Sequence, residues 1–522
     1  MRRAFPSREI AALAAALAAA GAPPRAWAQA PQPGLTLQQA LDAAADRSGG
    51  VRLAREQLAG ALGAARAARG AFDPTLTSFV TSTRDNTLGW TGRGADSVLP
   101  SRTLASSYGV ALERRFRSGL SVSPEVRATR REFSPDATGR NNTASVSMVM
   151  QLPLLRGAGG QLAAPERAAA ATSDAARADL LHATAVGALD AADAYWAYAA
   201  AAERLEVQRQ AEARARRLVE QTRILVAAQE RAQADLNPLL AALATRQAAR
   251  SAAEQELVEA RSTLGLVMGL EGDAISTLAL PATPLPSITR GAGAETGALV
   301  RQALERRADL AAARQAVRAA GVLADAAQAG TRPRLDLQLS VGYTGAVPGE
   351  AWSSLVTPFY RDLNTWSASL EVSWQAALGN SAAAGGAAQS RALQRQGQVA
   401  AEELERRIRA GVAVAAEALR HGQEEMERAD EAVALSRTSV ENEERKFQLG
   451  MSTLFDVIQA EDQLTGALLS RISTQQRYAA ARARLAFETG ALVRDAGGRA
   501  AADASPLAES PSPPPAAAEA SR

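Results

Sequence analysis

One domain-sized unit is used twice in this chain of 522 residues. When the sequence is shifted by 221 residues, a run near the C-terminus aligns without a gap with an earlier run. The matched pairs are Asp235 with Asp456, Arg261 with Arg482, Leu264 with Leu485 and Gly269 with Gly490. Solenoid repeats have periods of about 20 to 50 residues, so this spacing predicts duplication of a whole unit.

The composition favours long helices over compact domains. Hydrophobic residues make up 47% of the chain, mostly Ala and Leu, whereas aromatic residues make up only 4%. The chain has no cysteine, which excludes disulfides, thiolate zinc sites, a cysteine nucleophile and a lipid anchor on an N-terminal cysteine.

Residues 1–28 have the layout of an export signal. A basic start precedes a short Ala/Leu run and the small residues Ala26 and Ala28. This segment carries four arginines and one glutamate, so removing it cancels the excess of 58 basic over 55 acidic residues. A mature chain without net charge gives no support for nucleic-acid binding. No later run approaches the about 20 apolar residues of a spanning helix, so we expect any membrane crossing to use a barrel.

Helical and strand-like stretches follow one another in both halves. We expect long helices near 161–228 and 387–449, each about 95 to 100 Å long at 1.5 Å per residue. Shorter helices are expected near 35–70, 233–268, 299–330 and 454–490. Two of these stacked end to end match one long helix, which predicts a wall about 100 Å tall.

Strands are predicted where the apolar period changes from helical to two. Two strands carry one apolar face each, formed by Leu335, Leu339 and Tyr343 and by Trp366, Leu370 and Trp374. Eight residues at about 3.4 Å, tilted by about 40°, span roughly 21 Å, close to the height of an outer-membrane apolar band. A half-buried sheet in a soluble sandwich gives the same alternation. A sandwich needs more strands than we find, so we expect other copies of the chain to complete the sheet.

A further hairpin is predicted from residues 108–116 and 120–130, around Arg117-Ser118-Gly119. The stretch 144–152 alternates equally clearly, but 75–83 does not. The pattern leaves open whether the hairpin joins a barrel or projects outside it.

Near the C-terminus, one helix ends and another begins within a few residues. Gly450 suits the left-handed residue that closes a helix, and Thr453-x-x-Asp456 is a capping-box pattern. The run from Phe447 through Gly450, Met451, Ser452, Thr453 and Leu454 to Asp456 resembles the hairpin turn of the TolC family of trimeric outer-membrane efflux channels. Arg306–Arg314 resembles the start of that family's second half.

This resemblance implies an α+β membrane protein. We expect a trimeric outer-membrane β-barrel, continued by a long periplasmic α-helical barrel and built from two repeats. The expected segments are a signal at 1–28, a first repeat at 29–270, a linker at 271–298, a second repeat at 299–492 and a disordered tail at 493–522. The lipid-facing residues would be the six apolar residues of the two strands.

The resemblance also implies a function. The chain would be the passive exit duct of a tripartite efflux or type I secretion system, working with a periplasmic membrane-fusion adaptor and an inner-membrane transporter. Phe447, Gly450, Met451, Ser452, Thr453 and Leu454 would form the adaptor-docking turn. The alternative is a structural coiled-coil envelope protein without a pore.

Asp456 and its counterpart Asp235 carry the sharpest hypothesis. In a trimer each would recur three times around the axis and form a periplasmic gate that favours cations. Helix capping alone also explains a carboxylate in a first turn, and for Asp456 the sequence does not separate the two roles. Gln459 and Pro238 stand where several family members have a second Asp, and Ser452 replaces an Arg of the turn.

Enzyme chemistry has no foothold in the sequence. His182 and His421 lie in long helices without the converging groups that a metal or catalytic site needs. Gly157-Ala-Gly-Gly160 precedes a helix, but the sole lysine is Lys446, which excludes a P-loop. We therefore expect no catalytic residues, no metal and no cofactor.

Overall fold

The computed structural model describes residues 34–90, 98–134, 140–158, 160–230, 232–288, 295–349, 351–360, 364–495 and 500–507. The expected export signal and residues 508–522 of the expected tail lie outside these ranges. The helices are α1 (Leu37–Arg47), α2 (Gly49–Gly70), α3 (Ala164–Ala227), α4 (Leu236–Val267), α5 (Asp273–Ser276), α6 (Thr296–Arg306), α7 (Ala308–Ala329), α8 (Ser381–Gln448) and α9 (Leu454–Glu488). The strands are β1 (Thr75–Trp90), β2 (Val98–Arg115), β3 (Ser121–Ser134), β4 (Arg140–Pro153), β5 (Arg334–Pro348), β6 (Asn364–Gln375), β7 (Val493–Asp495) and β8 (Ala500–Ala502).

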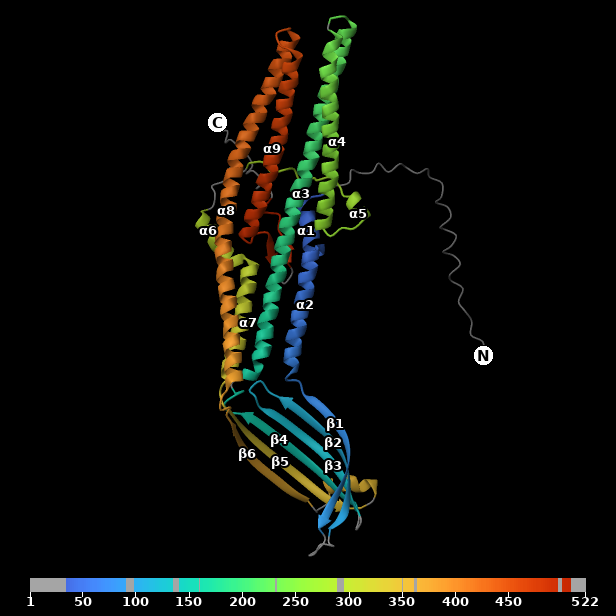
Figure 1. Ribbon diagram of the computed structural model, residues 1–522, viewed down its shortest axis with the longest axis vertical. Helices are drawn as coiled ribbons and strands as arrows, with labels where there is room; N and C mark the ends of the chain where they lie inside the picture. Colours follow the sequence, from blue (N-terminus) through green and yellow to red (C-terminus); the bar gives the residue numbers. More distant parts are fainter. Residues whose placement is uncertain are drawn as a thin grey trace, which may run out of the picture.

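The molecule is elongated, with a sheet at one end and helical hairpins reaching away from it (Figure 1). The sheet has the order β1-β2-β3-β4-β5-β6, and every neighbouring pair is antiparallel. The expected α+β class is confirmed. The hairpin near residues 108–130 forms part of β2 and β3, so it belongs to this sheet. The weakly alternating stretch 75–83 is the first half of β1.

The predicted strand faces are confirmed by the register of β5 and β6. Leu335 pairs with Trp374, Leu339 with Leu370 and Tyr343 with Trp366. Directly opposed residues lie on the same face of a sheet, so these six side chains form one apolar surface. The exposed fractions of the β6 side chains are high: 77% for Trp366, 67% for Leu370 and 68% for Trp374.

Strict alternation along β5 places Asp336 opposite the apolar residues, on the face expected to meet water. Its side chain lies on the polar face of β5, but it is buried within the chain. Arg334 forms an ion pair with its carboxylate, and Gln151 Nε2 donates a hydrogen bond to Oδ2 at 3.2 Å. The neighbouring strand β4 supplies Gln151, a contact that alternation along β5 alone does not reveal.

Each long helix packs along two sets of shorter helices. The helix α3 packs against α1, α2 and α4, and α8 packs against α6, α7 and α9. Because α2 and α4 lie beside different parts of α3, the shorter helices together cover the length of the long one (Figure 1). With 64 and 68 residues, α3 and α8 confirm the expected long helices. They extend about 96 and 102 Å at 1.5 Å per residue.

The two expected helices at 35–70 and 299–330 are each broken once. Ser48 and Arg307 adopt non-helical backbone angles, and both breaks separate an 11-residue helix from a 22-residue one. At the first break, the Ser48 hydroxyl accepts a hydrogen bond from the Val51 amide and caps α2. Apolar periodicity continues through both breaks, so it gives no sign of them. None of the helices in the described ranges combines the length and apolar character that a membrane crossing requires.

The main core surrounds the middle of α3. Tyr195, Trp196 and Tyr198 are buried there. The Tyr195 hydroxyl donates to the carbonyl of Leu35 at 2.9 Å and accepts from the amide of Thr283 at 2.9 Å. The expected linker therefore wraps against the wall at this level.

Residues 493–495 and 500–507, which belong to the expected disordered tail, are ordered in the structure. The strands β7 and β8 pair with each other, and Leu492, Ala502 and Leu507 are buried in the main core. The Gln38 side chain also holds this segment, because its amide group donates to Ala502 O and its oxygen accepts from Ala504 N, both at 3.0 Å. The low apolar content of this segment predicts disorder, but a few buried side chains are enough to pack it against the helices.

A buried ion network joins the second set of helices. Arg307, between α6 and α7, forms ion pairs with Asp309 and with Glu488 at the end of α9. Burial alone would raise the pKa of Asp309, but the hydrogen bonds and charge of Arg307 outweigh it and lower that pKa. Gly411 of α8 lies so close to Glu488 that an added Cβ would meet its carboxylate at 2.9 Å. The network therefore fixes three elements at one point.

We expect Arg307→Ala to lower the free energy of unfolding by about 3 kcal/mol, the lower end for a broken buried pair, because Asp309 is only partly buried and Glu488 keeps Arg484 as a second partner. Arg428→Ala, which breaks the exposed pair with Glu431 on α8, should change it by less than about 1 kcal/mol. Denaturant unfolding of the purified protein, followed by circular dichroism, measures both. Equal losses in the two variants would show that the Arg307 network is not a stabilising centre.

Candidate functional site

The candidate site lies at the end of the molecule farthest from the sheet, where two helical hairpins reverse direction (Figure 1). The first turn joins α3 to α4 and the second joins α8 to α9. All six predicted docking residues, Phe447, Gly450, Met451, Ser452, Thr453 and Leu454, fall in or beside the second turn. The turn lies at one exposed tip, as the sequence predicts.

The second turn is closed by backbone hydrogen bonds around Gly450. Its φ of 73° is left-handed, and its amide donates to the carbonyl of Phe447 at 3.1 Å. The amide of Met451 donates to the carbonyl of Lys446 at 2.8 Å. This pair of bonds is a Schellman motif, which satisfies carbonyls that the end of α8 leaves free. Nothing lies within 4 Å of a Cβ built on Gly450, so only the left-handed backbone conformation favours glycine there.

Asp456 caps α9 through one of its two carboxylate oxygens. Its Oδ2 accepts from the Thr453 amide at 2.9 Å and from the Thr453 hydroxyl at 2.6 Å. The Thr453 hydroxyl in turn accepts from the Asp456 amide, which completes the predicted capping box. The hydrogen bonds from Thr453 lower the pKa of Asp456. The carboxylate therefore stabilises the turn above its ordinary pKa, and this contribution is lost as the pH falls through the lowered value.

Ser452 adds a second link within the turn. Its hydroxyl lies 2.9 Å from Glu443 Oε2 and 3.3 Å from Asp456 Oδ2. Hydrogen bonds from Lys446 and Ser452 lower the pKa of Glu443. Ser452, which stands where the resembled turn has an Arg, thus links Glu443 and Asp456 within one chain.

Asp235 has different surroundings in the first turn. It immediately precedes α4 but makes no side-chain capping hydrogen bond. Gln229, which corresponds to Gly450 after the shift of 221 residues, adopts a φ of 61° although it is not glycine. The structure therefore separates two positions that the sequence treats alike. Asp456 acts in capping, whereas the carboxylate of Asp235 has no such task.

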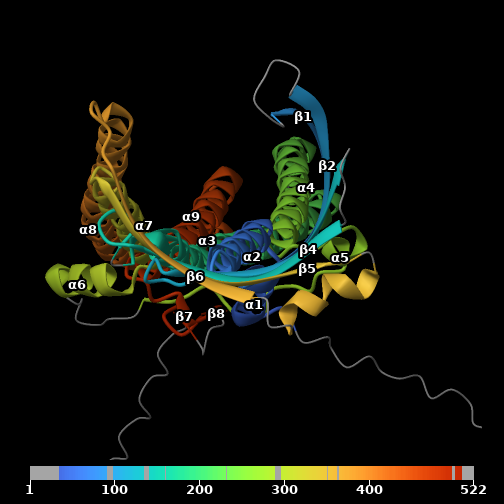
Figure 2. The same ribbon diagram turned by 90° about the horizontal axis from the view of Figure 1, so that it is seen from below.

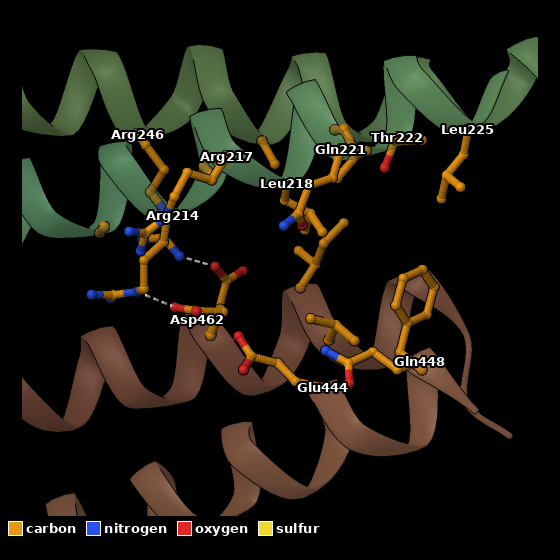
Figure 3. A pocket seen from close by; sticks show the side chains of 18 of the residues that line it. Arg214, Arg217, Leu218, Gln221, Thr222, Leu225, Arg246, Glu444, Gln448 and Asp462 are labelled. Carbon is orange, nitrogen blue, oxygen red and sulfur yellow. Dashed lines mark hydrogen bonds and ion pairs between the residues drawn. The ribbon is translucent and has the colours of Figure 1, made fainter. Parts of the chain in front are cut away.

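A cleft of about 750 Å³ lies between the two hairpins just behind the turns (Figure 3). Apolar side chains from both hairpins line one part, including Leu225, Leu239, Phe447 and Val457. Ion pairs cross the other part. Arg214 Nε lies 2.6 Å from Glu461 Oε2, and Arg246 pairs with Asp462. These pairs tie the hairpins together at the base of the cleft.

Exposed apolar side chains surround the turns. The exposed fraction is 75% for Met451, which the sequence singles out. Three similarly exposed neighbours were missed by sequence reasoning: Ile224, Leu449 and Phe455. Helical periodicity could have identified Phe455, because it lies off the buried face that contains Val457, Ala460 and Leu464.

Neither histidine belongs to the candidate site at the turns. His421 lies exposed among glutamates on α8, and the ring of His182 lies 6.0 Å from that of Phe487. Within the described ranges, no group of three or more His, Cys, Asp or Glu residues is arranged to hold a metal ion.

Comparison with known proteins gives one family match and several structural matches. Residues 299–491 match the family described as outer membrane efflux protein. The fold is similar to the Vibrio cholerae outer membrane protein VceC, with a TM-score of 0.63, 19% identity, and coverage of 87% of this chain and 96% of that chain. For the Campylobacter jejuni CmeC outer membrane channel, the TM-score is 0.64 and the identity is 12%, with coverage of 87% of this chain and 85% of that chain. For the open state of the Neisseria gonorrhoeae MtrE outer membrane channel, the TM-score is 0.62 and the identity is 18%, with coverage of 87% of this chain and 88% of that chain. A comparison with curated proteins finds no match.

Exchanging the residue types at the two left-handed positions should move stability in opposite directions. We expect Gly450→Ala to lower the free energy of unfolding by about 1 kcal/mol and Gln229→Gly to raise it by about 0.5 kcal/mol. The space around Gly450 is open, so steric overlap contributes nothing to the first effect. Denaturation midpoints of the two variants and the parent measure both. Stabilisation by Gly450→Ala would contradict the role of the left-handed turn.

Proposed function

Since residues 299–491 belong to the outer membrane efflux protein family, we propose that the chain is the exit duct of a tripartite efflux or type I secretion system. The family match confirms the predicted resemblance, the outer-membrane location and the absence of an enzymatic role. The finer statements on assembly, partners and gate are our proposals. The observation that carries them is a sheet with one apolar and one polar face, joined directly to helices about 100 Å long.

We propose that three copies assemble around one axis. Their sheets would close into an outer-membrane β-barrel, and their helices would continue it as a periplasmic α-barrel. Trp366, Leu370, Trp374, Leu335, Leu339 and Tyr343 would face outer-membrane lipid. The opposite face, with residues such as Ser369 and Glu371, would face water in the duct.

Duplication of an ancestral unit explains the shared layout of the two halves. Both halves contain an 11-residue helix, a 22-residue helix, strands, a long helix and a returning helix. Gly269 and Gly490, separated by the repeat spacing, have φ angles of 70° and 69°. The proposed repeats remain 29–270 and 299–492, joined by the linker 271–298.

The adaptor would dock at the helical turns. An α-helical hairpin from a periplasmic membrane-fusion adaptor would use the exposed apolar side chains of the tip and the cleft between the hairpins. An inner-membrane transporter would supply the energy, since the proposed duct is passive and takes no cofactor.

The gate would be formed by aspartates at the same end. Three copies of Asp235 would surround the axis with carboxylates that no capping bond engages. Asp456 would add charge to this end, but its hydrogen bonds make capping its main role.

A duct and a spacer without a pore differ in two measurable properties. The duct hypothesis predicts a trimer that resists SDS until it is heated, and stepwise ion conductance when the purified protein is added to planar bilayers. A coiled-coil spacer would give no conductance even if it formed trimers. Absence of conductance from a verified trimer would overturn the proposed function in favour of the spacer.

Asparagine substitutions separate the two aspartates. We expect Asp235→Asn to lower the cation preference several-fold, measured by reversal potentials in a salt gradient, with little change in thermal stability. Asp456→Asn should lower thermal stability, because it weakens the capping box, and should change selectivity less. If Asp235→Asn leaves selectivity unchanged, its assignment to the gate is wrong.

A further inference from the structure

The sheet contains more strands in the first half of the chain than in the second. The strands β1 to β4 precede α3, whereas only β5 and β6 precede α8. One additional hairpin therefore enlarges the first half. All six strands form one continuous antiparallel sheet, which curves from β6 to β1 (Figure 2).

One row of paired residues shows that the apolar face crosses the whole sheet. Each residue in this row pairs with the next: Ser78, Val110, Val126, Val146, Tyr343 and Trp366. Val110, Val126 and Val146 are exposed. The apolar surface proposed to meet lipid on β5 and β6 thus continues over β4, β3 and β2.

The opposite face is equally continuous and is mostly polar. The row beginning at Thr77 continues through Ala111, Glu125, Ser147, Gly342 and Ser367. Within it Glu125, Ser147 and Ser367 are polar, whereas β2 and β5 contribute Ala111 and Gly342. The hairpin strand β3 therefore has the same two-sided character as β4 and β6.

Contacts on the polar face hold β1 in register. The ring of Phe79 lies over Gly109 of β2, where a Cβ would meet the ring at 2.3 Å. The guanidinium carbon of Arg127, on β3, lies 5.1 Å from the centroid of the same Phe79 ring. Three strands thus share one packed contact, which opposes displacement of β1 from the sheet.

The turn between β2 and β3 is fastened to the helical wall. Arg117 Nε and Nη2 donate to the two oxygens of Glu166 at 2.7 and 2.8 Å. Glu166 lies in the first turn of α3, and Arg117 also lies over the ring of Phe72, which follows α2. A bidentate pair of this kind fixes orientation as well as distance. The hairpin is therefore anchored where sheet and helices meet.

The two edges of the sheet are suited to each other. The strand β1 leaves the helical end and β6 returns to it, so β1 of one copy would run antiparallel to β6 of the next (Figure 1). Both edge strands expose apolar side chains, with Leu76 70% and Val80 72% exposed on β1 and Trp366 77% exposed on β6. Lipid offers an open edge no hydrogen-bond partners, so a second copy of this chain is the occupant that satisfies both edges.

The width of the six-stranded sheet also agrees with the width of the helical layer that joins it. Four helices, α2, α3, α7 and α8, join the sheet in each chain. At 8 to 10 Å between axes they cover about 32 to 40 Å of circumference. Six strands spaced by about 4.8 Å and tilted by about 40° cover about 38 Å, whereas four would cover only about 25 Å.

We propose that β1 of each chain pairs with β6 of the next, so that six strands from each of three copies close an eighteen-stranded barrel. This inference rests on the proposed trimeric duct. Barrel diameter grows roughly linearly with strand number, so the lumen is about 1.5 times as wide as that of twelve strands at equal tilt. The barrel is then about as wide as the helical wall that continues it.

Cysteine cross-linking of the full-length protein tests this pairing, because the parent chain has no cysteine. Leu76→Cys or Val80→Cys on β1 is combined in turn with Trp366→Cys, Leu370→Cys or Trp374→Cys on β6. Disulfides need Cα atoms about 4.4 to 6.8 Å apart, so at least one combination should give covalent trimers on non-reducing gels after oxidation. Thr81→Cys, on the opposite face of β1, is the matched control and should cross-link much less.

A twelve-stranded barrel, with four strands from each chain, could leave out either of two strand pairs. If β1 and β2 lay outside it, β3 would lie beside β6, so Val126→Cys on β3 is combined with the same β6 positions. If β2 and β3 lay outside it, β1 would pair with β4, so Val80→Cys is combined with Val146→Cys to detect a cross-link within one chain. Cross-linking through β3, a β1–β4 cross-link within the chain, or the absence of β1–β6 cross-links in an intact trimer would overturn the eighteen-stranded barrel and leave the duct standing. If no SDS-resistant trimer forms in the parent protein, the proposed function fails, and the barrel inference fails with it.

Discussion

Burial around the middle of α3 is the constraint on which the rest of the structure depends. Tyr195, Trp196 and Tyr198 pack there against residues from α1, the end of α4, the segment around Leu285 and α9. Both halves of the chain meet at this level, together with the segment that follows α9. Above and below it, α3 contacts its neighbours mainly through small side chains and ion pairs. The tall wall is therefore held by a central core rather than by uniform packing.

Alanine makes the wall above and below that core possible. Ala168, Ala171 and Ala319 form a small cluster where α3 meets α7, and such side chains let helices approach closely. Burying an alanine removes little apolar area from water and does not distinguish one helix from another. Charged pairs therefore help to specify which helices meet. Arg214 with Glu461 joins α3 to α9, and Arg471 Nε lies 2.5 Å from Asp430 of α8. The many charges of the chain thus serve helix association.

The sequence predicted features with a local physical cause. The capping box at Thr453, the left-handed Gly450 and the apolar face of β6 each depend on a few adjacent residues. Features that depend on distant partners were missed. Asp336 is covered by a contact with Gln151 of the neighbouring strand. Residues 500–507 are ordered because Gln38 hydrogen-bonds to Ala502, and Ala502 and Leu507 pack into the core around α3. The breaks at Ser48 and Arg307 escaped because apolar periodicity continues across them.

The two turns show how duplication allows divergence at one functional end. Both turns close with the two backbone bonds of a Schellman motif, and the second adds a complete capping box and a Ser452 link, so its backbone is held from more directions. The first keeps Gln229 in a left-handed conformation and leaves Asp235 without a capping task. A well-held turn suits a surface that must match a docking partner. A carboxylate free of capping bonds keeps its hydrogen-bonding capacity for water and passing cations. The repeat thus supplies both properties from one ancestral turn.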